Sequence, residues 1–243
     1  MTFASSEAVA RHGHLAAARP AGSVRADLHT HTMWSGDSTT TPEEFAAAVA
    51  ASGLDVVCIT DHNAIDGAVE LQDRLACRVI VGEELRTAAG EIIGLFLGER
   101  IPMGISHVDA AKAIRDQGGV VYIPHPFDPM RRNMSEDALY ELAEADLIDA
   151  VEVLNAKTSL ASSNQRAAEF AAEFGIVGGA GSDGHVPDAL GAAYVEMADF
   201  ETPLEFLASL ASGTVIGHHW DEPRPWSPRI VPSVPKQVRP PLL

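Results

Sequence analysis

The sequence predicts an α/β fold, either a parallel sheet flanked by helices or a β/α barrel. Short segments rich in Val, Ile and Leu alternate along the chain with segments of helical periodicity. Successive strand-like segments lie about 30 residues apart, which is typical of repeated β/α units. Nearly every such segment ends in a residue that can bind a metal ion, and this end of the strand is where β/α barrels carry their active sites.

The expected elements follow one another in β/α order. The strands are expected over residues 24–29, 55–60, 78–82, 91–98, 120–124, 150–154 and 176–181, and near residue 192. The first helix is expected to begin after Thr41, which can cap it, because Pro42 and two acidic residues follow in the first turn and the helix runs to about Ser52. Further helices are expected over residues 64–75, 108–117, 164–174 and 203–210, and after Ser135.

The two ends of the chain are expected to lie outside the barrel domain of residues 24–217. Residues 1–23 are rich in Ala and broken by Gly and Pro, which predicts a flexible arm. Residues 218–243 are expected to form a tail, because seven of the chain's fifteen prolines fall there. The tail starts with His218-His219-Trp220, which is expected to pack on the edge of the barrel, with a metal or aromatic contact as the alternative.

The charge of the chain excludes some partners. Asp and Glu number 34 against 17 Lys and Arg, so the formal net charge is −17 and the pI about 4.8. A surface of that sign disfavours long nucleic acids. No stretch approaches the roughly 18 apolar residues that span a bilayer, so neither a conventional secretory signal nor a membrane partner is expected. The two cysteines predict no framework of disulfide bonds, so the protein is expected in the reducing cytoplasm.

The first expected strand ends in a pair of histidines. Because side chains alternate along an extended strand, His29 and His31 should project to the same side about 7 Å apart and grip one metal ion. His12 and His14 have the same spacing, but no strand precedes them. These two are therefore expected to be solvent-exposed and without a role.

Four further segments end in potential ligands. They carry Asp61-His62, Glu83-Glu84, His125, and Asp183 with His185. A single polar residue at a strand end is ordinarily a cap or a satisfied polar group. Five such sites, all expected at the same end of the fold, predict a metal centre.

Taken in order, the motifs DLHTHT, ITDHN, GEE, IPHP and GSDGH resemble those of the PHP (polymerase and histidinol phosphatase) domain family. The likeness covers residues 24–197, and the segment from residue 151 resembles small, stand-alone bacterial members. The resemblance implies a distorted (β/α)7 TIM-like barrel, the PHP fold, with two or three divalent ions such as Mn, Zn or Fe. It also implies hydrolysis of phosphate esters.

The resemblance also implies a set of metal ligands. One ion would be held by His29, His31, Glu83 and Asp183, and a second by Glu83, His125 and His185. Glu83 would bridge the two. A third ion would use His62 and Asp37, with Glu152 in place of a histidine that this chain lacks between its fourth and fifth motifs. Asp27 and Asp61 would orient ligating histidines.

The expected chemistry needs no serine or cysteine nucleophile. Two ions bridged by a carboxylate can hold a shared hydroxide that attacks phosphorus, and they neutralise the phosphoryl oxygens. The catalytic candidates are Asp61, His62, Glu83, His125 and Asp183. The general acid is left open between Asp61, Glu84 and His107. The candidates for binding the phosphorylated substrate are Arg131, Arg132, Lys157 and Asn155.

The expected substrate is a phosphate monoester of a small metabolite, since little chain follows the barrel for a second substrate domain. The alternative is a phosphodiesterase or exonuclease acting on short oligonucleotides or nucleoside bisphosphates. An amidohydrolase-like barrel would use a strand-end lysine as metal bridge, and none of the three lysines is suitably placed. A barrel that binds a metal or a partner without catalysing a reaction would be expected to have lost metal ligands, whereas this sequence keeps them. The oligomeric state is left open.

Overall fold

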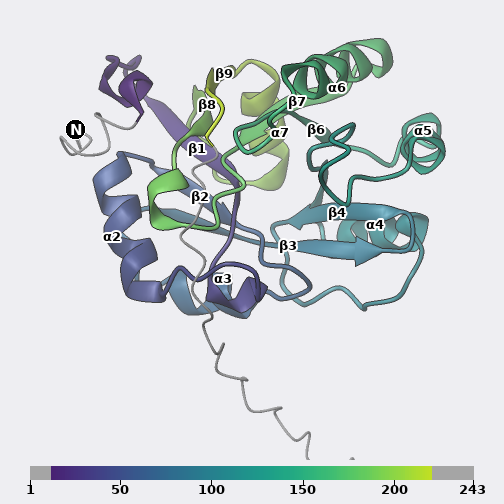
Figure 1. Ribbon diagram of the computed structural model, residues 1–243, viewed down its shortest axis with the longest axis horizontal. Helices are drawn as coiled ribbons and strands as arrows, with labels where there is room; N and C mark the ends of the chain where they lie inside the picture. The colour runs from purple at the N-terminus through teal and green to yellow at the C-terminus, as the bar shows by residue number, and fades with distance from the viewer. Residues whose placement is uncertain (1–11, 221–243) are drawn as a thin grey trace, which may run out of the picture.

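The computed structural model describes residues 12–220. The nine strands in that range form one sheet in the order β7-β6-β5-β4-β3-β2-β1-β8-β9, which curls into a nearly closed barrel (Figure 1). The strands are β1 (Ser23–Thr30), β2 (Val56–Ile59), β3 (Arg78–Thr87), β4 (Gly90–Leu95), β5 (Val120–Ile123), β6 (Ala150–Asn155), β7 (Val177–Gly181), β8 (Ala193–Ala198) and β9 (Thr214–Gly217). The predicted α/β barrel class is confirmed.

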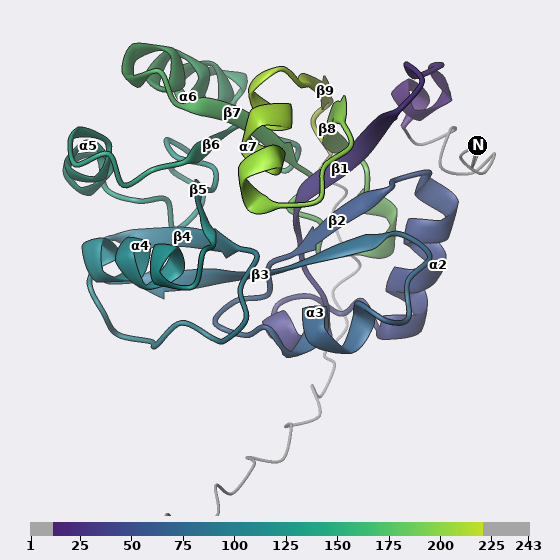
Figure 2. The same ribbon diagram turned by 180° about the vertical axis from the view of Figure 1, so that it is seen from behind.

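Helices lie on the outside of the strands (Figures 1 and 2). They are α2 (Pro42–Ser52), α3 (Asp66–Leu71), α4 (His107–Asp116), α5 (Glu136–Glu144), α6 (Ala161–Phe174) and α7 (Pro203–Ala211), with the 3-10 turns η1 (Gly13–Ala16), η2 (Met33–Ser35) and η3 (Pro187–Ala189). The predicted cap of α2 is present, since the Thr41 hydroxyl accepts the N–H of Glu44. Within residues 12–220, no helix has the length and apolar character needed to cross a membrane.

The sheet is mixed rather than parallel throughout. β1, β2 and β3 are parallel neighbours, as are β5, β6 and β7, but β4 runs antiparallel to both β3 and β5. β3 continues five residues beyond the predicted end at residue 82 and turns back tightly into β4. The extension matters for the site because it makes Glu83 and Glu84 part of a strand, where adjacent side chains face opposite ways.

β1 has different neighbours along its two halves. Its first half, Ser23 to Ala26, pairs with the antiparallel β8. At its other end the carbonyl of His29 accepts the N–H of Asp183 at 2.8 Å, and the N–H of His31 donates to the carbonyl of Gly184 at 3.0 Å. The segment after β7 thereby closes the barrel at the end where the predicted ligands lie.

Alternation along the strands divides the apolar side chains between the barrel interior and the helices. In β2, Val56 and Cys58 belong to the interior cluster, whereas Val57 and Ile59 pack with residues of α2 and α3. A separate cluster under α4, α5 and α6 includes the fully buried Leu139. Burial on both faces explains why these strands are apolar at nearly every position.

The segment before β1 packs against the barrel. Leu15, in η1, is 3% exposed and contacts the cluster under α2, and His12 is 1% exposed. The prediction that His12 lies in solvent is wrong, because the chain folds back over the loop between β7 and β8. Trp220 packs on the interior cluster, as predicted for the edge. The rest of the predicted arm and tail, residues 1–11 and 221–243, lies outside the described residues.

Candidate metal centre

The end of β1 carries two histidines that face each other. His29 and His31 are fully buried, and their Nε2 atoms lie 3.0 Å apart. They share one face of the strand because a single residue separates them. That residue, Thr30, points the other way and donates its hydroxyl to the carbonyl of Cys58 at 2.8 Å. Two imidazole nitrogens are thus presented at one point.

Glu152, on β6, holds the His29 ring from behind. Its carboxylate lies 3.2 Å from Nδ1 of His29 and accepts the backbone N–H of His125 at 2.8 Å. Because a carboxylate only accepts, Nδ1 carries the hydrogen and Nε2 turns its lone pair toward His31. The prediction that Glu152 would be a ligand of a third ion is corrected: this carboxylate contacts the nitrogen of His29 that faces away from the cluster.

Glu84 occupies the middle of the cluster. Its Oε2 lies 3.3 Å from Nε2 of His31 and 3.0 Å from Nδ1 of His62. Its Oε1 lies 3.1 Å from Nε2 of His125. One carboxylate therefore contacts imidazoles from three strand ends, which is the placement expected of a bridging ligand.

Glu83 points to the opposite face of β3. Its Oε2 accepts the backbone N–H of Ile101 at 2.8 Å, and its Oε1 lies 3.7 Å from Nε of Arg100. Burial raises the pKa of this carboxyl group, and the Ile101 N–H and Arg100 oppose the increase. The prediction that Glu83 lies at the bridging position is corrected: the adjacent Glu84 lies there instead, because one position along a strand reverses the side of the sheet.

Asp37 meets two histidines at the mouth of the barrel. Its Oδ2 lies 3.1 Å from Nε2 of His62 and its Oδ1 lies 3.4 Å from Nε2 of His185. The rings of His31 and His185 are 4.0 Å apart. The structure thus brings His62 and Asp37 together, as predicted for one ion. His185, predicted to share an ion with His125, groups with these residues instead.

His125 and Asp183 follow β5 and β7 in backbone conformations unusual for residues other than glycine. Their φ angles are 28° and 49°. The carboxylate of Glu152 holds the N–H of His125, and the carbonyl of His29 holds the N–H of Asp183. The surrounding hydrogen bonds therefore fix two turns that direct both side chains into the cluster.

The donor set fits divalent metal ions. Among residues 12–220, four overlapping groups place potential ligand atoms within 4.8 Å of one another. These groups are His31, Asp37, His62 and His185; His29, His31 and Glu84; His29, His125 and Asp183; and His62, Glu84 and Glu91. Nε2 of His29 faces the nitrogen of His31 and the oxygens of Glu84 and Asp183, all lone-pair donors. Such atoms repel one another unless a proton or a metal ion lies between them.

The charges of the cluster favour a bound cation. Burial alone lowers the pKa of His29, but the carboxylates of Glu152, Glu84 and Asp183 outweigh burial and raise it well above its usual value. Burial raises the pKa of Asp183, but Lys157 and His29 hold it well below its usual range. The Asp183 carboxylate thus favours its ionised form and the His29 imidazole attracts positive charge, which a metal ion would supply.

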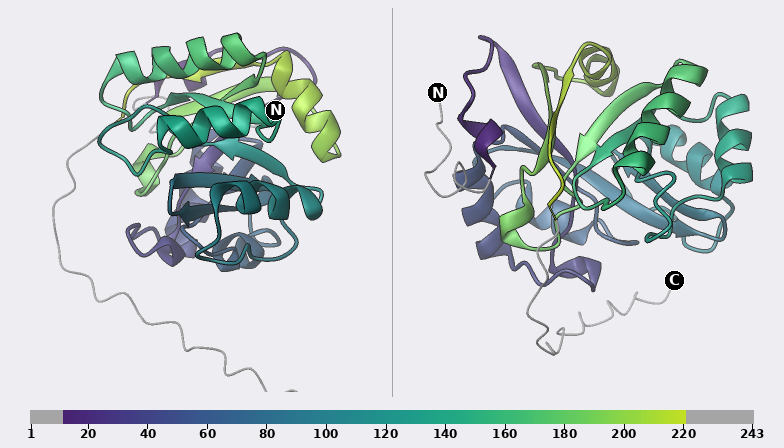
Figure 3. Two further views of the ribbon diagram at one scale, coloured as in Figure 1. Left: turned by 90° about the vertical axis from the view of Figure 1, so that its right-hand side faces the viewer. Right: turned by 45° about the horizontal axis from the view of Figure 1, so that its top comes forward.

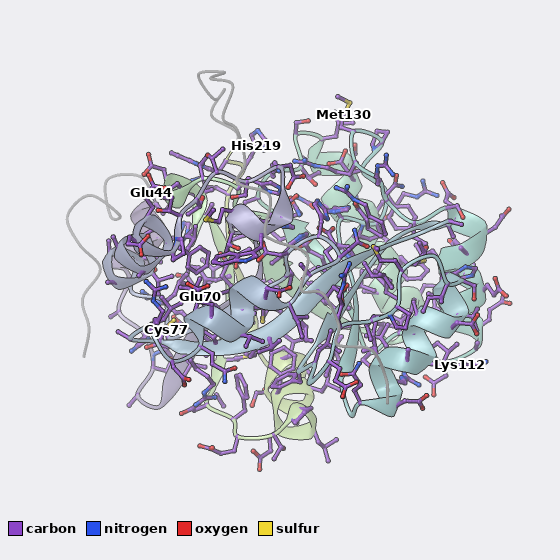
Figure 4. All side chains as sticks on the ribbon, turned by 90° about the horizontal axis from the view of Figure 1, so that it is seen from below. Glu44, Glu70, Cys77, Lys112, Met130 and His219 are labelled. Atoms are coloured by element: carbon purple, nitrogen blue, oxygen red, sulfur yellow. The ribbon has the colours of Figure 1, made fainter. Side chains whose placement is uncertain are left out.

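The cluster forms the floor of a cavity of about 180 Å³ with arginines at its rim. Arg131 and Arg132, both predicted, line it together with Arg86 and the exposed Met130, which projects from the surface (Figure 4). Lys157 lies beside the cluster, with its Nζ 2.9 Å from Nδ1 of His185. Basic side chains therefore surround the opening above the carboxylates.

Three other predicted residues support the site without facing the cavity. The carboxylate of Asp61 accepts the N–H and the hydroxyl of Thr32 at 2.6 and 2.5 Å, so it anchors the loop after His31 rather than a histidine ring. Asp27 accepts the N–H of His29, and burial raises its pKa to about 6. Asn155, expected to bind substrate, is fully buried and donates to Glu152 at 2.9 Å.

His107 lies apart from the cavity. It begins α4, and its Nε2 lies 2.8 Å from Oε2 of Glu141 on α5. The pair connects two outer helices. The structure therefore does not bring His107 to the position of a general acid.

Sequence reasoning missed Arg86 and Glu91. The two residues pair across the β3–β4 hairpin, and Nε of Arg86 lies 3.0 Å from Oε1 of Glu91. Both line the cavity. Alternation from Glu84 would have placed Arg86 on the same face, had the sequence been treated as a strand through residue 87.

The chain matches most of the length of two curated relatives. The chain is 39% identical over 146 residues to the uncharacterized protein MJ1587 of Methanocaldococcus jannaschii, covering 55% of this chain and 82% of the relative. It is 32% identical over 193 residues to the uncharacterized protein MJ0417 of the same organism, covering 76% and 78%. A family model described as "PHP-associated" matches residues 161–215.

Solved structures share the fold. A two-domain protein from Bacteroides vulgatus, described as containing a predicted PHP-like metal-dependent phosphoesterase, superposes with a TM-score of 0.66 at 18% identity, over 83% of this chain and 67% of that one. The lesion-specific endonuclease PfuEndoQ of Pyrococcus furiosus gives 0.58 at 15% identity, over 79% and 57%. The chain belongs to the PHP family, as its motifs predicted. Because both curated relatives are archaeal, the expected likeness to bacterial members is not confirmed.

Proposed function

We propose that this chain is a metal-dependent phosphoesterase that hydrolyses a phosphate monoester of a small metabolite. The observation that carries the proposal is the cavity of about 180 Å³, with imidazoles and carboxylates on its floor and Arg86, Arg131 and Arg132 around it. Arginine binds phosphoryl oxygens through paired N–H donors. A space of this size accommodates a phosphoryl group and a small leaving group better than a polymer.

The proposed ligands are the side chains that the structure brings together. They are His29, His31, Asp37, His62, Glu84, His125, Asp183 and His185, with Glu91 at the edge of the set. Nitrogen and carboxylate donors suit Mn, Zn or Fe, and the overlap of the four groups accommodates two or three ions. Such ions, when bound, would activate water and neutralise the oxygens of the phosphoryl group.

The chain's own residues would hold and orient the substrate. Arg131 lies 3.8 Å from Asp183 and can reach a phosphoryl oxygen above it. Arg86 also lines the cavity, 3.7 Å from Asp37. These cations would fix the phosphorus over the floor of the cavity and offset the charge that grows on its oxygens during attack. Glu91 keeps Arg86 in place through their 3.0 Å contact.

A second candidate is a phosphodiesterase or exonuclease acting on short oligonucleotides or nucleoside bisphosphates. Two observations favour it: the structurally similar PfuEndoQ is described as an endonuclease, and Met130, 77% exposed at the rim, offers an apolar surface to a base. The net charge of −17 opposes long polyanions but not a short substrate.

The test compares hydrolysis of an aryl phosphate monoester and a matched bis-aryl diester by manganese-supplemented protein, with a chelator as control. A chelator-sensitive preference for the monoester supports the proposal. A preference for the diester favours the second candidate. Hydrolysis of neither, in protein shown to contain bound metal, argues against both simple esters and calls for a screen of sugar and nucleotide monophosphates.

A further inference from the structure

Arg132 differs from the other arginines that the structure describes. Each of the others lies at ion-pair distance from a carboxylate. Among residues 12–220, the guanidinium of Arg132 has no such partner and makes no hydrogen bond or ring contact. The chain carries 34 acidic against 17 basic residues, so a guanidinium without a carboxylate beside it is unexpected.

The loop between β5 and α5 holds Arg132 at the rim of the cavity. The carboxylate of Asp128 accepts the N–H of Met130 at 2.9 Å, and its carbonyl accepts the N–H of Arg131 at 3.1 Å. The carbonyl of Arg132 accepts the N–H of Glu91 on β4 at 3.0 Å. The loop then leads into α5, which lies beside α6 (Figure 3). Its backbone is therefore held in place, while the side chain of Arg132 is exposed.

The other two arginines of the cavity already face carboxylates of the metal centre. Nε of Arg86 lies 3.0 Å from Oε1 of Glu91, and a terminal nitrogen of Arg131 lies 3.8 Å from Oδ2 of Asp183. Both would act on the reacting phosphoryl group, together with the bound ions. The charge of Arg132 is not offset in this way within the described part of the chain, so it can bind an anion that the substrate brings.

The lining of the cavity favours a charged leaving group over an apolar one. Among the described residues that line it, only Met130 has an apolar side chain, and this side chain is 77% exposed. A wholly apolar leaving group would therefore bury little surface here. An anionic group beside Arg132 would form charge-assisted hydrogen bonds instead.

We propose that Arg132 binds a second anionic group, a carboxylate or a further phosphate, on the leaving group of the substrate. This inference rests on the proposed function, because it concerns the alcohol part of the same phosphate monoester. A guanidinium presents paired N–H donors that match two oxygens of a carboxylate or a phosphate. The substrate class is therefore a small phosphate monoester with a further acid group, in preference to the phosphate of a neutral alcohol.

The test measures the binding of phosphonates to manganese-loaded protein by calorimetry, because their carbon–phosphorus bond is not hydrolysed. The ligands are phosphonocarboxylates of increasing chain length, each compared with the alkylphosphonate of the same length. At the best length, we expect wild type to bind the phosphonocarboxylate at least about 10-fold more tightly, the effect of one charge-assisted hydrogen bond. Arg132→Gln should lose this preference, and Arg132→Lys should keep part of it. Diphosphonates of the same lengths show whether a second phosphate is preferred to a carboxylate.

Arg74→Gln is the matched control and should keep the preference, because Arg74 pairs with Glu70 on the surface. Arg132→Gln removes no contact of the folded chain, so this variant is expected to fold. A preference that is absent at every length, or that persists in Arg132→Gln, would overturn the proposal. Persistence would indicate that the second anion binds a metal ion instead. Since binding is measured without turnover, these outcomes are distinct from a failure to hydrolyse phosphate monoesters, which would count against the proposed function.

Discussion

The carboxylate of Glu152 lies 3.2 Å from Nδ1 of His29 and leaves the opposite nitrogen of that ring facing the metal centre. Glu152 thereby connects β6 to β1, and it also holds the backbone of His125. Its effect on a metal ion is indirect, through the orientation and basicity of an imidazole.

Glu152→Gln should weaken metal binding by about 10–100-fold, because the amide loses the charge that makes His29 a strong donor. Competition with a chromophoric chelator measures the affinity. Glu173→Gln, on the exposed face of α6, is the matched control. Wild-type affinity in the Glu152 variant would show that the contact has no part in metal binding.

Glu84→Gln and Glu83→Gln should have opposite consequences although the positions are adjacent. Glu84 contacts three histidines, so its variant should lose bound metal and at least 100-fold in kcat, an order-of-magnitude expectation for a lost bridging charge. Glu83 faces away from the cluster, so the Glu83→Gln variant should keep its bound metal and its kcat within about threefold of wild type. Metal analysis and steady-state kinetics check the pair, and a reversed outcome would restore Glu83 as the bridge.

Glu83 should also make stability depend on pH. Burial raises its pKa in the folded state above the ordinary value of 4.5. Its contribution to the free energy of unfolding is therefore greatest below pH 4.5 and is lost as pH rises through the folded pKa. The melting temperature of the Glu83→Gln variant should rise relative to that of wild type as pH increases from 4.5. A constant difference in melting temperature across that range would contradict this assignment.

Arg131→Gln should lower kcat/KM by roughly 10–150-fold, which corresponds to the loss of about 1.5–3 kcal/mol from a charge-assisted hydrogen bond. Its metal content should not change, since arginine is not a ligand. Arg166→Gln is the control, because Arg166 pairs with Glu136 on the surface. An unchanged kcat/KM in the Arg131 variant would remove this residue from substrate binding.

Gly181→Ala should disrupt the centre without replacing any of the proposed ligands. A Cβ at this position would lie 2.4 Å from Cβ of His29 and 2.7 Å from Oε1 of Glu152. We expect a loss of about 1–3 kcal/mol in the free energy of unfolding and a larger relative loss of metal affinity. Gly98→Ala, where the nearest atom is 4.0 Å away, is the control. Chemical denaturation and metal titration measure the two effects.

The sequence predicted the barrel and most of the side chains at its mouth because strand alternation and strand ends are local properties. His29 and His31 needed only the two-residue period. The same period was not applied to Glu83 and Glu84, because the third strand was predicted to end at residue 82. Glu83 was therefore predicted in the position that Glu84 occupies. The position of Glu152 behind His29 depends on how two strands 123 residues apart face each other, and no local pattern contains that information.

The seam of the barrel has a consequence for synthesis. The residues that close it are also proposed ligands or their neighbours: His29 and His31 on one side, and Asp183 and Gly184 on the other. A ribosome must therefore release β7 and the turn after it before the first two histidines can acquire their final partner. A metal ion that met the chain earlier in translation would find an incomplete set of the proposed donors, so we expect the centre to load only once the barrel is complete.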